Sequence, residues 1–530
     1  MDLDLELVKN EISALVKPGD PGFAVGVYAD GAALLTAAQG MACVEFGVPI
    51  DARTRFGVAS VSKQFTAACV LMLAREGRLG LDDDVRAHVP GLSLGVPVTL
   101  RQCLQHTGGL PEWYALQSLV GAPPAEMTQE RVLGIIRKVR ETTFPPGTDY
   151  AYSNTGYVLA AVVIAEVTGR PFAEFARERI FAPLGMDGTR FRDDASLPLP
   201  GLAYGYANAD GVPRRADIHE SAVGDSGLVT GVDDLAPWFG FLADGRVLGA
   251  GLRDAMLERA VLADGTVLPY AFGVYHTRIA GRAAYGHAGG VHGYRSNLLY
   301  LPDPGFGVGV LCNQTAIGAI ALGERLARLL LGEPSLAPVI PGETMNEVMA
   351  EVMAEVPTGH WHNPADDGVL TVEAGPDGRI GLELGGSDVG FVPGADGRWY
   401  GTGGAEGLWL AREEDRLVLG AVSEAARPVV YLPCDPPGTE PLPDGDYRSE
   451  ELDVRVTVRN GVLGVGSHLR LPVEPAPAGM WRAGPFMLRP GSGDLLFSGS
   501  GLRRMRFTGC PDGARPARPA RPARPAGNSG

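Results

Sequence analysis

A serine and a lysine stand one helical turn apart in the tetrapeptide Ser60-Val-Ser-Lys63. Apolar residues recur at helical spacing after Ser60, which predicts a helix whose first turn carries the hydroxyl and the amine on one face. Arginine fills nearly every other basic position, but arginine cannot act as a base, whereas a desolvated lysine can. The pair therefore predicts a serine nucleophile with a lysine beside it. Because Ser-x-x-Lys also arises by chance, the prediction depends on further motifs.

Two further motifs could supply the remaining groups of such a site. In Tyr152-x-Asn154 a single residue separates a phenol from an amide, so an extended segment would project both side chains the same way. The segment His287-x-Gly289-Gly290 joins an imidazole to glycines, which allow a backbone to approach a ligand closely. Taken alone, the first motif is typical of a turn with a packed ring, and the second is typical of a glycine-rich turn.

Composition excludes several classes of function. The chain has 530 residues, of which 45% are hydrophobic and 20% charged, values typical of a globular protein of about two to four domains. Its formal net charge is −16 without a basic stripe, so we expect no nucleic-acid partner. The acidic start does not resemble a signal peptide, and no apolar run is long enough to span a bilayer. With 6 scattered cysteines, we expect a cytoplasmic protein with reduced thiols and no membrane partner.

The predicted elements describe an α+β fold. Two apolar runs over residues 23–28 and 33–38 flank Asp30-Gly31, which predicts a β-hairpin. Strands at both ends of a helical region predict an antiparallel sheet assembled from both ends of one domain. The helices are expected after Ser60 and over 129–140, 156–167 with a C-cap at Gly169, 172–180 and 317–331, and the late strands over 296–301 and 306–312.

The pattern changes after residue 332. A proline-containing segment is followed by short, glycine-punctuated strands with almost no helical periodicity. The final segment repeats Arg-Pro-Ala and cannot bury apolar area. We expect a catalytic domain over 1–332, a linker over 333–357, two small β domains over 358–434 and 445–510, and a disordered tail over 511–530.

Two other segments of the sequence could form a functional site in place of the serine–lysine pair. Ser226 lies in Gly-Asp-Ser-Gly, a sequence like the nucleophile segment of trypsin-like proteases, but their all-β double barrel and upstream histidine segment are not apparent. We therefore interpret this segment as a turn. His360 and His362 could project two imidazoles from one strand face, yet no third ligand is apparent. We expect neither a metal nor a cofactor.

Taken in order, the three motifs resemble those of the penicillin-recognising serine hydrolases, which include penicillin-binding proteins, class C β-lactamases, esterases and D-aminopeptidases. The resemblance covers residues 20–332 and extends to flanking sequences such as His106-Thr-Gly-Gly-Leu-Pro111. The two trailing β domains are similar to those of bacterial D-aminopeptidases. The resemblance implies a β-lactamase/transpeptidase-like catalytic domain, an antiparallel sheet with helices, followed by two small lipocalin-like antiparallel β-barrels.

The resemblance also implies roles for the motif residues. Ser60 attacks a carbonyl, and either neutral Lys63 or ionised Tyr152 takes its proton. The N–H groups of Ser60 and Gly290 form the oxyanion hole. His287 replaces the lysine of the usual Lys-Thr-Gly motif, which favours substrates without a free carboxylate. A loop of the last barrel enters the cleft in the D-aminopeptidases, and its expected counterpart lies between Met487 and Leu495. The implied site is catalytic Ser60, Lys63 and Tyr152, with Asn154, His287, Gly289 and Gly290 binding substrate or oxyanion.

We therefore expect a serine hydrolase that forms an acyl-enzyme with small amides or peptides carrying a D-residue on the acyl side. A penicillin-binding-protein-type peptide cyclase and a carboxylesterase remain alternatives, because both use the same nucleophile. A binding or scaffold protein that uses the β domains is the non-enzymatic alternative, which the intact set of Ser60, Lys63 and Tyr152 disfavours. A homodimer is left open.

Overall fold

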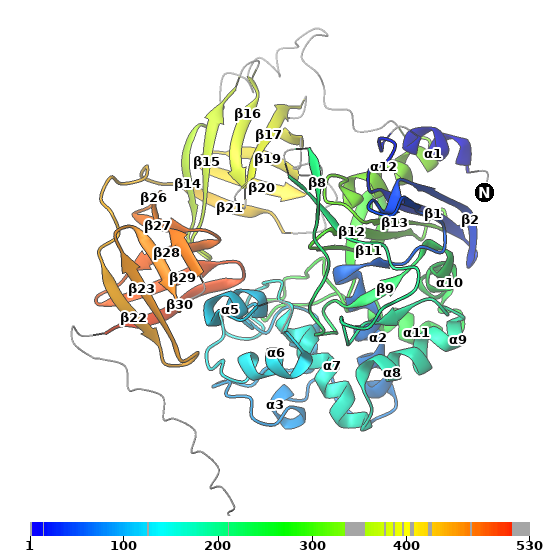
Figure 1. Ribbon diagram of the computed structural model, residues 1–530, viewed down its shortest axis with the longest axis horizontal. Coiled ribbons are helices and arrows are strands. Elements are labelled where there is room, and N and C mark those ends of the chain that lie inside the picture. Colours follow the sequence, from blue (N-terminus) through cyan, green and yellow to red (C-terminus); the bar gives the residue numbers. More distant parts are fainter. Residues whose placement is uncertain are drawn as a thin grey trace, which may run out of the picture.

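The computed structural model describes residues 3–13, 15–123, 127–209, 211–333, 356–375, 378–384, 387–394, 397–402, 408–421, 427–466 and 469–510. Figure 1 shows a large N-terminal α+β part, a yellow β-barrel and an orange-to-red β-sheet folded upon itself. The predicted tail over 511–530 and all but the ends of the predicted linker over 333–357 lie outside the described residues. The domain boundaries stay predictions.

A six-stranded antiparallel sheet forms the centre of the N-terminal part. Its strands are β1 (Phe23–Ala29), β2 (Ala32–Gln39), β10 (Tyr275–Ile279), β11 (Arg282–Val291), β12 (Tyr294–Leu301) and β13 (Phe306–Cys312). Their order is β10-β11-β12-β13-β1-β2, so the first strand pairs with the last, as the sequence predicts. β1 and β13 are buried on both faces, which explains their unbroken apolar sequences.

Helices cover both faces of this sheet. α1 (Leu5–Ile12) and α12 (Ala319–Leu330) bury Val8 and Leu326 against one face. The other face carries α10 (Ala236–Asp244) and the pair formed by α2 (Ser62–Arg75) and α7 (Thr155–Thr168). α2 is buried from Ser62 through Leu73, so the helix predicted to carry the nucleophile lies in the middle of the fold rather than on its surface.

Short elements connect these layers. The helical ones are η1 (Ala59–Val61), α3 (Val85–His88), α4 (Leu100–Leu104), α5 (Trp113–Val120), α6 (Gln129–Ile136), α8 (Phe172–Ala176), η3 (Arg177–Phe181), α9 (Ala182–Leu184), η4 (Val232–Asp234) and α11 (Ala250–Met256). The strands are β3 (Met41–Cys43), β4 (Val48–Pro49), β5 (Phe56–Gly57), β6 (Arg190–Phe191), β7 (Tyr206–Ala209), β8 (Val212–Arg215) and β9 (Leu228–Thr230).

The predicted helix over 172–180 is interrupted. α8 passes into η3, a π-helical turn, and α9 begins directly after it with Pro183 in its first turn. Proline has no N–H to donate to the preceding turn, so the hydrogen-bonding pattern widens at this point. The periodicity of apolar residues does not reveal such a change.

Two β-barrels follow the N-terminal part. Barrel B closes by pairing its first strand with its last, and consists of β14 (Gly359–Asn363), β15 (Gly368–Ala374), β16 (Ile380–Leu384), β17 (Ser387–Pro393), β18 (Trp399–Thr402), β19 (Leu408–Glu413), β20 (Arg416–Ala421) and β21 (Val429–Pro433). Barrel C is a nine-stranded antiparallel sheet of β22 (Gly445–Ser449), β23 (Val454–Arg459), β24 (Val462–Val465), β25 (Leu469–Pro472), β26 (Glu474–Ala476), β27 (Met480–Ala483), β28 (Phe486–Pro490), β29 (Asp494–Gly499) and β30 (Leu502–Gly509).

Barrel C is nearly closed rather than closed. β25 and β26 are the two ends of its strand order, and Pro472 and Pro475 lie on them. Because proline offers no N–H to a neighbouring strand, it favours such an edge. The lipocalin-like architecture predicted for the region after residue 332 is otherwise present.

Barrel C packs closely on the N-terminal part. Leu452, in the turn between β22 and β23, is 1% exposed and belongs to the same apolar core as Ile136 of α6. Lys138 Nζ donates to the Leu452 carbonyl oxygen at 3.3 Å, and Arg140 N donates to the Glu451 carboxylate. The predicted helix over 129–140 ends early, at Ile136. The N–H groups of Lys138 and Val139 bond to the carbonyl oxygens three residues before them, and barrel C supplies the partner of Arg140 N.

Barrel B is tied to barrel C through Asp367 in the turn between β14 and β15. Its carboxylate, on a residue that is 1% exposed, accepts from Arg489 Nη2 at 2.8 Å and from Ser498 Oγ at 2.8 Å. Arg504 Nε donates to the same carboxylate at 3.2 Å. These partners lie on β28, β29 and β30, so one carboxylate connects three strands of barrel C.

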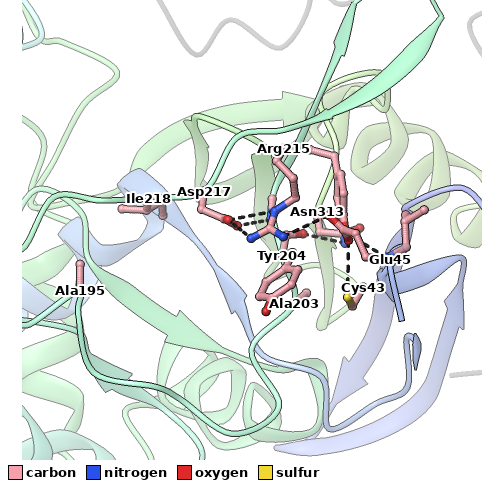
Figure 2. Close-up of polar contacts among 12 residues, drawn as sticks. Cys43, Glu45, Ala195, Ala203, Tyr204, Arg215, Asp217, Ile218 and Asn313 are labelled. Atoms are coloured by element: carbon pink, nitrogen blue, oxygen red, sulfur yellow. Dashed lines mark hydrogen bonds and ion pairs between the residues drawn. The ribbon is translucent and has the colours of Figure 1, made fainter. Parts of the chain in front are cut away.

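A polar cluster holds the β7–β8 hairpin beside the central sheet (Figure 2). Arg215 Nη1 lies 3.0 Å from Glu45 Oε1, and its Nε lies 3.0 Å from Asp217 Oδ2. The guanidinium carbon lies 3.6 Å from the centroid of the Tyr204 ring. The carbonyl oxygen of residue 216 accepts from Gly293 N at 2.8 Å. The cluster thereby holds the β11–β12 turn, at the end of the strand that carries the third motif.

Candidate active site

Ser60 lies in η1, directly before α2. Ala59 before it has a φ of 47°, a conformation that residues with a side chain seldom adopt. η1 packs directly on β11, because a Cβ at Gly289 would lie 2.2 Å from the Val58 carbonyl oxygen. Only glycine permits this approach. The fold therefore places Ser60 on a strained turn against the strand that carries the third motif.

Three oxygen atoms surround the amine of Lys63. Its Nζ lies 3.1 Å from Ser60 Oγ, 2.6 Å from Asn154 Oδ1 and 2.8 Å from the Asp225 carbonyl oxygen. Only the serine oxygen can also donate, because an amide oxygen and a peptide carbonyl carry no proton. A neutral amine therefore donates its two N–H bonds to Asn154 and Asp225 and directs its lone pair at Ser60. This is the geometry of a base in contact with a nucleophile.

The protonation states favour Lys63 over Tyr152 as the base. Burial lowers the pKa of Lys63 to about 8, and the charges of Asp225 and Glu112 oppose part of that lowering. Burial and Tyr275 raise the pKa of Tyr152 well above its usual value. The two groups adjoin, with Nζ 4.9 Å from the centroid of the Tyr152 ring. Near neutral pH, the amine loses its proton more readily than the phenol does.

Two buried acids beside Lys63, Glu112 and Asp225, are not among the site residues predicted from the sequence. The backbone N–H of Asn154 donates to Glu112 Oε2 at 2.7 Å. The indole N–H of Trp113 donates to Asp225 Oδ2 at 3.3 Å. Burial raises the pKa of both carboxyls. In the sequence, Glu112 has the appearance of a helix cap and Asp225 that of a turn residue, so neither could be distinguished there.

The Gly-Asp-Ser-Gly segment orients Lys63. A Cβ at Gly224, whose φ is 116°, would lie 2.4 Å from the Tyr157 carbonyl oxygen. The Gly224 carbonyl oxygen accepts from Thr66 Oγ1 at 2.6 Å. Glycine thus lets the segment lie between α2 and α7, where Asp225 presents its carbonyl oxygen to Lys63.

His287 faces Tyr152 from β11, with ring centroids 6.1 Å apart. Its Nδ1 lies 2.5 Å from the Ala288 carbonyl oxygen, which can only accept, so this nitrogen carries the proton. Its Nε2 lies 3.2 Å from the Tyr270 hydroxyl. Burial and the Lys63 charge lower the pKa of His287 to about 3. The imidazole is neutral and both nitrogens are engaged, so it offers no charge to a substrate carboxylate.

The intervening serines of the first two motifs have structural contacts. Ser62 Oγ donates to the Ala59 carbonyl oxygen at 2.5 Å and accepts from Leu228 N at 3.1 Å. Ser153 N donates to His106 Nδ1 at 3.2 Å. The His106 ring packs against the Tyr152 ring, with centroids 4.3 Å apart. These contacts fix the turns on which the motif residues lie.

The edge of β11 is open at the site. β10 pairs with β11 only as far as Tyr275↔Gly286, so residues 287–291 extend beyond it. A Cβ at Gly290 would meet nothing closer than 3.5 Å, from Arg295. Packing alone therefore does not require glycine there, in contrast to Gly289.

A cavity of about 360 Å³ adjoins Tyr152 and Asn154. The N-terminal part and barrel C both line it. Glu112 carries the one charge in this lining, as far as the described residues show. The lining consists of Glu112, Tyr114, Ala115, Ser118, Tyr152 and Asn154 on one side and Pro485, Phe486, Ser500 and Gly501 on the other.

The turn expected to enter the cleft, between Met487 and Leu495, does not line this cavity. Successive turns of an antiparallel meander lie at opposite ends of its strands. The β28–β29 turn therefore points away, and the β27–β28 and β29–β30 turns reach the cavity. The second of these contacts the buried acid directly, since Glu112 N donates to the Gly501 carbonyl oxygen at 3.3 Å.

His360 and His362, the alternative metal ligands in the sequence, make other contacts. His362 Nε2 lies 3.4 Å from Asp367 Oδ1, and His360 Nδ1 lies 3.1 Å from Thr371 Oγ1. Among the described residues, no cluster of three or more histidine, cysteine or acidic side chains could hold a metal ion. A search of the same residues finds no helix with the length and apolar character needed to cross a membrane.

Comparison with known proteins agrees with this geometry. Residues 8–333 match the family model described as Beta-lactamase. A D-aminopeptidase of Cereibacter sphaeroides is 27% identical over 496 residues, which cover 90% of this chain and 91% of that protein. A D-aminopeptidase of Gluconobacter oxydans is 32% identical over 316 residues, which cover 59% of each chain. The octameric penicillin-binding protein homologue from Pyrococcus abyssi has a TM-score of 0.55 at 22% identity, and the match covers 81% of this chain and 98% of that chain.

Fold and sequence together define a serine hydrolase. The chain belongs to the Beta-lactamase family. The likeness to penicillin-recognising hydrolases predicted from the three motifs is thereby confirmed, and the match to the Cereibacter protein extends past residue 333 into the trailing barrels.

Proposed function

We propose that this protein is a D-aminopeptidase or D-amino-acid amidase that acts on small amides and peptides through an acyl-enzyme on Ser60. The observation that carries the proposal is the contact of Lys63 Nζ with Ser60 Oγ at 3.1 Å while two acceptor oxygens hold its N–H bonds. The D-aminopeptidases that match most of this chain support the substrate class.

In the proposed mechanism, Ser60 Oγ attacks the substrate carbonyl and its proton passes to neutral Lys63. The N–H groups of Ser60 and Gly290 stabilise the developing oxyanion. Lys63, aided by the adjoining Tyr152 hydroxyl, then gives the proton to the leaving amine. A water molecule attacks the acyl-enzyme by the same route and releases the acid. Asn154 holds Lys63 in position and turns its amide towards the substrate.

The cavity beside Tyr152 suits the acyl side of a substrate with a free amine. Its volume of about 360 Å³ accommodates one residue rather than a long chain, and the turns of barrel C limit how long a bound substrate can be. Glu112 supplies the negative charge that a substrate ammonium requires. On the side of the leaving group, neutral His287 provides no positive charge for a free substrate carboxylate. The site therefore favours small aminoacyl substrates.

The small volume of the cavity, about 360 Å³, is the reason for placing hydrolysis of short substrates ahead of peptide cyclisation or ester hydrolysis, which would use the same Ser60. Homodimer formation and a cytoplasmic location stay predictions.

The proposal is tested with p-nitroanilides of D-alanine, L-alanine and N-acetyl-D-alanine. We expect turnover of the D-alanine compound, with loss of activity on the L and N-acetylated compounds. Glu112→Gln should lower kcat/KM for D-alanine p-nitroanilide by about a hundredfold, because a charge-assisted hydrogen bond contributes about 1.5–3 kcal/mol, but should leave p-nitrophenyl propionate within a few-fold. Ser118→Ala, in the same lining, is the control. Equal activity on the free and N-acetylated anilides would contradict the proposal.

A further inference from the structure

The site holds one buried base between two buried acids. Lys63, Glu112 and Asp225 are 0%, 8% and 1% exposed. Asn154 joins the first two, because its N–H donates to Glu112 Oε2 at 2.7 Å and its Oδ1 accepts from Lys63 Nζ at 2.6 Å. Asp225 flanks Lys63 through its carbonyl oxygen at 2.8 Å, and its carboxylate accepts from Trp113, the residue after Glu112. The three charged groups thus form one connected cluster.

No other group packed around Lys63 in the described site supplies a positive charge. Burial lowers the pKa of His106 and His287 below the usual value, so both are neutral at pH 7. The rings of Tyr152 and Tyr157 have centroids 4.9 Å and 5.4 Å from Nζ, and burial raises the pKa of both phenols. In this cluster, protonated Lys63 is the counter-ion of the acid pair.

A third acid nearby already has a partner of its own. Glu220 is 6% exposed, and its Oε1 lies 2.8 Å from His292 Nε2. Glu220 also acts on the Asp225 carboxyl as a like charge, so it adds to the negative potential without contributing to the hydrogen bonds of Lys63.

These charges keep Lys63 protonated, and the site therefore inactive, before a substrate binds. Burial lowers the pKa of Lys63 to about 8, and the charges of Asp225 and Glu112 keep it from falling further, so at pH 7 most molecules hold the ammonium form. A protonated Nζ has three N–H bonds and three oxygen partners, Ser60 Oγ among them. It then has no lone pair with which to take the serine proton.

Glu112 belongs to this cluster and also lines the cavity beside Tyr152 and Asn154. A cation that enters the cavity can therefore approach Glu112, the member of the acid pair that lines it. Building on the proposed function, we propose that the substrate ammonium, bound at Glu112, replaces Lys63 as the counter-ion of the Glu112–Asp225 pair, so that substrate binding itself turns Lys63 into the neutral base.

The charges balance in this step. One ammonium enters the site with the substrate, one N–H bond of Lys63 breaks, and the proton passes to solvent. The lone pair left on Nζ faces Ser60 Oγ, because Asn154 Oδ1 and the Asp225 carbonyl oxygen keep the remaining two N–H bonds. A substrate of the same shape that lacks an amine leaves Lys63 protonated.

The first test compares the pH dependence of kcat with that of kcat/KM, which report the substrate complex and the free protein respectively. For D-alanine p-nitroanilide we expect the acid limb of kcat to lie about one pH unit below that of kcat/KM, since a like charge nearby lowers the pKa of an amine by that order. For p-nitrophenyl propionate the two limbs should coincide. Coinciding limbs for the aminoacyl substrate would overturn the inference while leaving the proposed function in place. Absence of turnover of D-alanine p-nitroanilide would overturn both.

Substitutions distinguish the effect of the Glu112–Asp225 pair on Lys63 from the effect of other buried acids. Asp225→Asn should move the acid limb of kcat/KM to lower pH, because one of the two charges that hold the proton on Lys63 is removed. Glu220→Gln is the matched control, since the same change is made in a buried acid whose partner is His292. An unmoved limb in Asp225→Asn, or an equal movement in Glu220→Gln, would overturn the inference.

A binding measurement requires neither turnover nor an altered acid. D-alaninamide is bound to the Ser60→Ala variant at pH 7 by calorimetry in buffers of different ionisation enthalpy. Because a fall of the Lys63 pKa from about 8 by about one unit leaves about half of the amines protonated at pH 7, release of about 0.4 proton per site is expected for D-alaninamide, and none for propionamide. Binding of D-alaninamide without proton release would overturn the inference.

Discussion

The contact between η1 and β11 determines where the nucleophile lies, and Gly289→Ala tests it. The new Cβ would lie 2.2 Å from the Val58 carbonyl oxygen, 2.5 Å from Ser296 Oγ and 3.1 Å from Ala59 Cβ. Ordinary carbon–oxygen contacts need about 3.3 Å, so η1 and β11 must separate by about 1 Å. Ser60 directly follows Ala59 and moves with η1.

A displacement of this size should lower kcat/KM by about a hundredfold, equivalent to about 2.7 kcal/mol of transition-state stabilisation. The assay is steady-state turnover of D-alanine p-nitroanilide, with thermal unfolding measured in parallel to verify that the variant is folded. Gly381→Ala is the control, because a Cβ at this strand glycine of barrel B meets no atom within 4 Å. A folded Gly289→Ala with kcat/KM within threefold of the unaltered protein would refute the reasoning.

The remaining predictions concern the base, the contact between the barrels, and barrel C itself. Lys63→Arg should lower kcat/KM about a thousandfold or more, because arginine keeps the charge but cannot take the proton, whereas Ser226→Ala should change it less than about twofold in the same assay. Asp367→Asn should lower the free energy of unfolding in urea at pH 7 by about 2–4 kcal/mol. Burial opposes ionisation of Asp367, but hydrogen bonds from Arg504 and Ser498 prevail and lower its pKa. Its contribution is therefore present above about pH 4, the usual carboxyl pKa, and the difference between Asp367→Asn and the unaltered protein should shrink as the pH falls below that. A chain that ends at residue 333 should elute as aggregate in size-exclusion chromatography, because the apolar surface under barrel C becomes exposed; a soluble monomer would show that this surface is dispensable.

The sequence predicts those structural features that depend on residues close to one another in the chain. Ser60 and Lys63 are one turn apart, so their contact follows from helical periodicity. The hairpin at Asp30-Gly31 follows from a turn in which both residues have positive φ, 52° and 74°. The apolar sequences of β1 and β13 indicate that both strands are buried, and two such strands at opposite ends of a helical region indicate the sheet.

What could not be predicted depends on contacts between distant segments. The Asp225 carbonyl oxygen reaches Lys63 across 162 residues of chain, and no local pattern marks a backbone oxygen for that purpose. Glu112 is indistinguishable from an ordinary helix cap until Asn154 and Gly501 are placed against it. Hairpins are recognisable in barrel C, but the end of the sheet that faces the cleft is set by how the barrel packs on α5 and α6.

The central claim is that Ser60 is the nucleophile and that Lys63 activates it. The most direct test is to label the protein with a serine-directed fluorophosphonate, digest it and locate the adduct by mass spectrometry. We predict a single adduct on the peptide that contains Ser60, its loss in Ser60→Ala and slow formation in Lys63→Arg. An adduct on Ser226, or undiminished labelling of Ser60→Ala, would contradict the account.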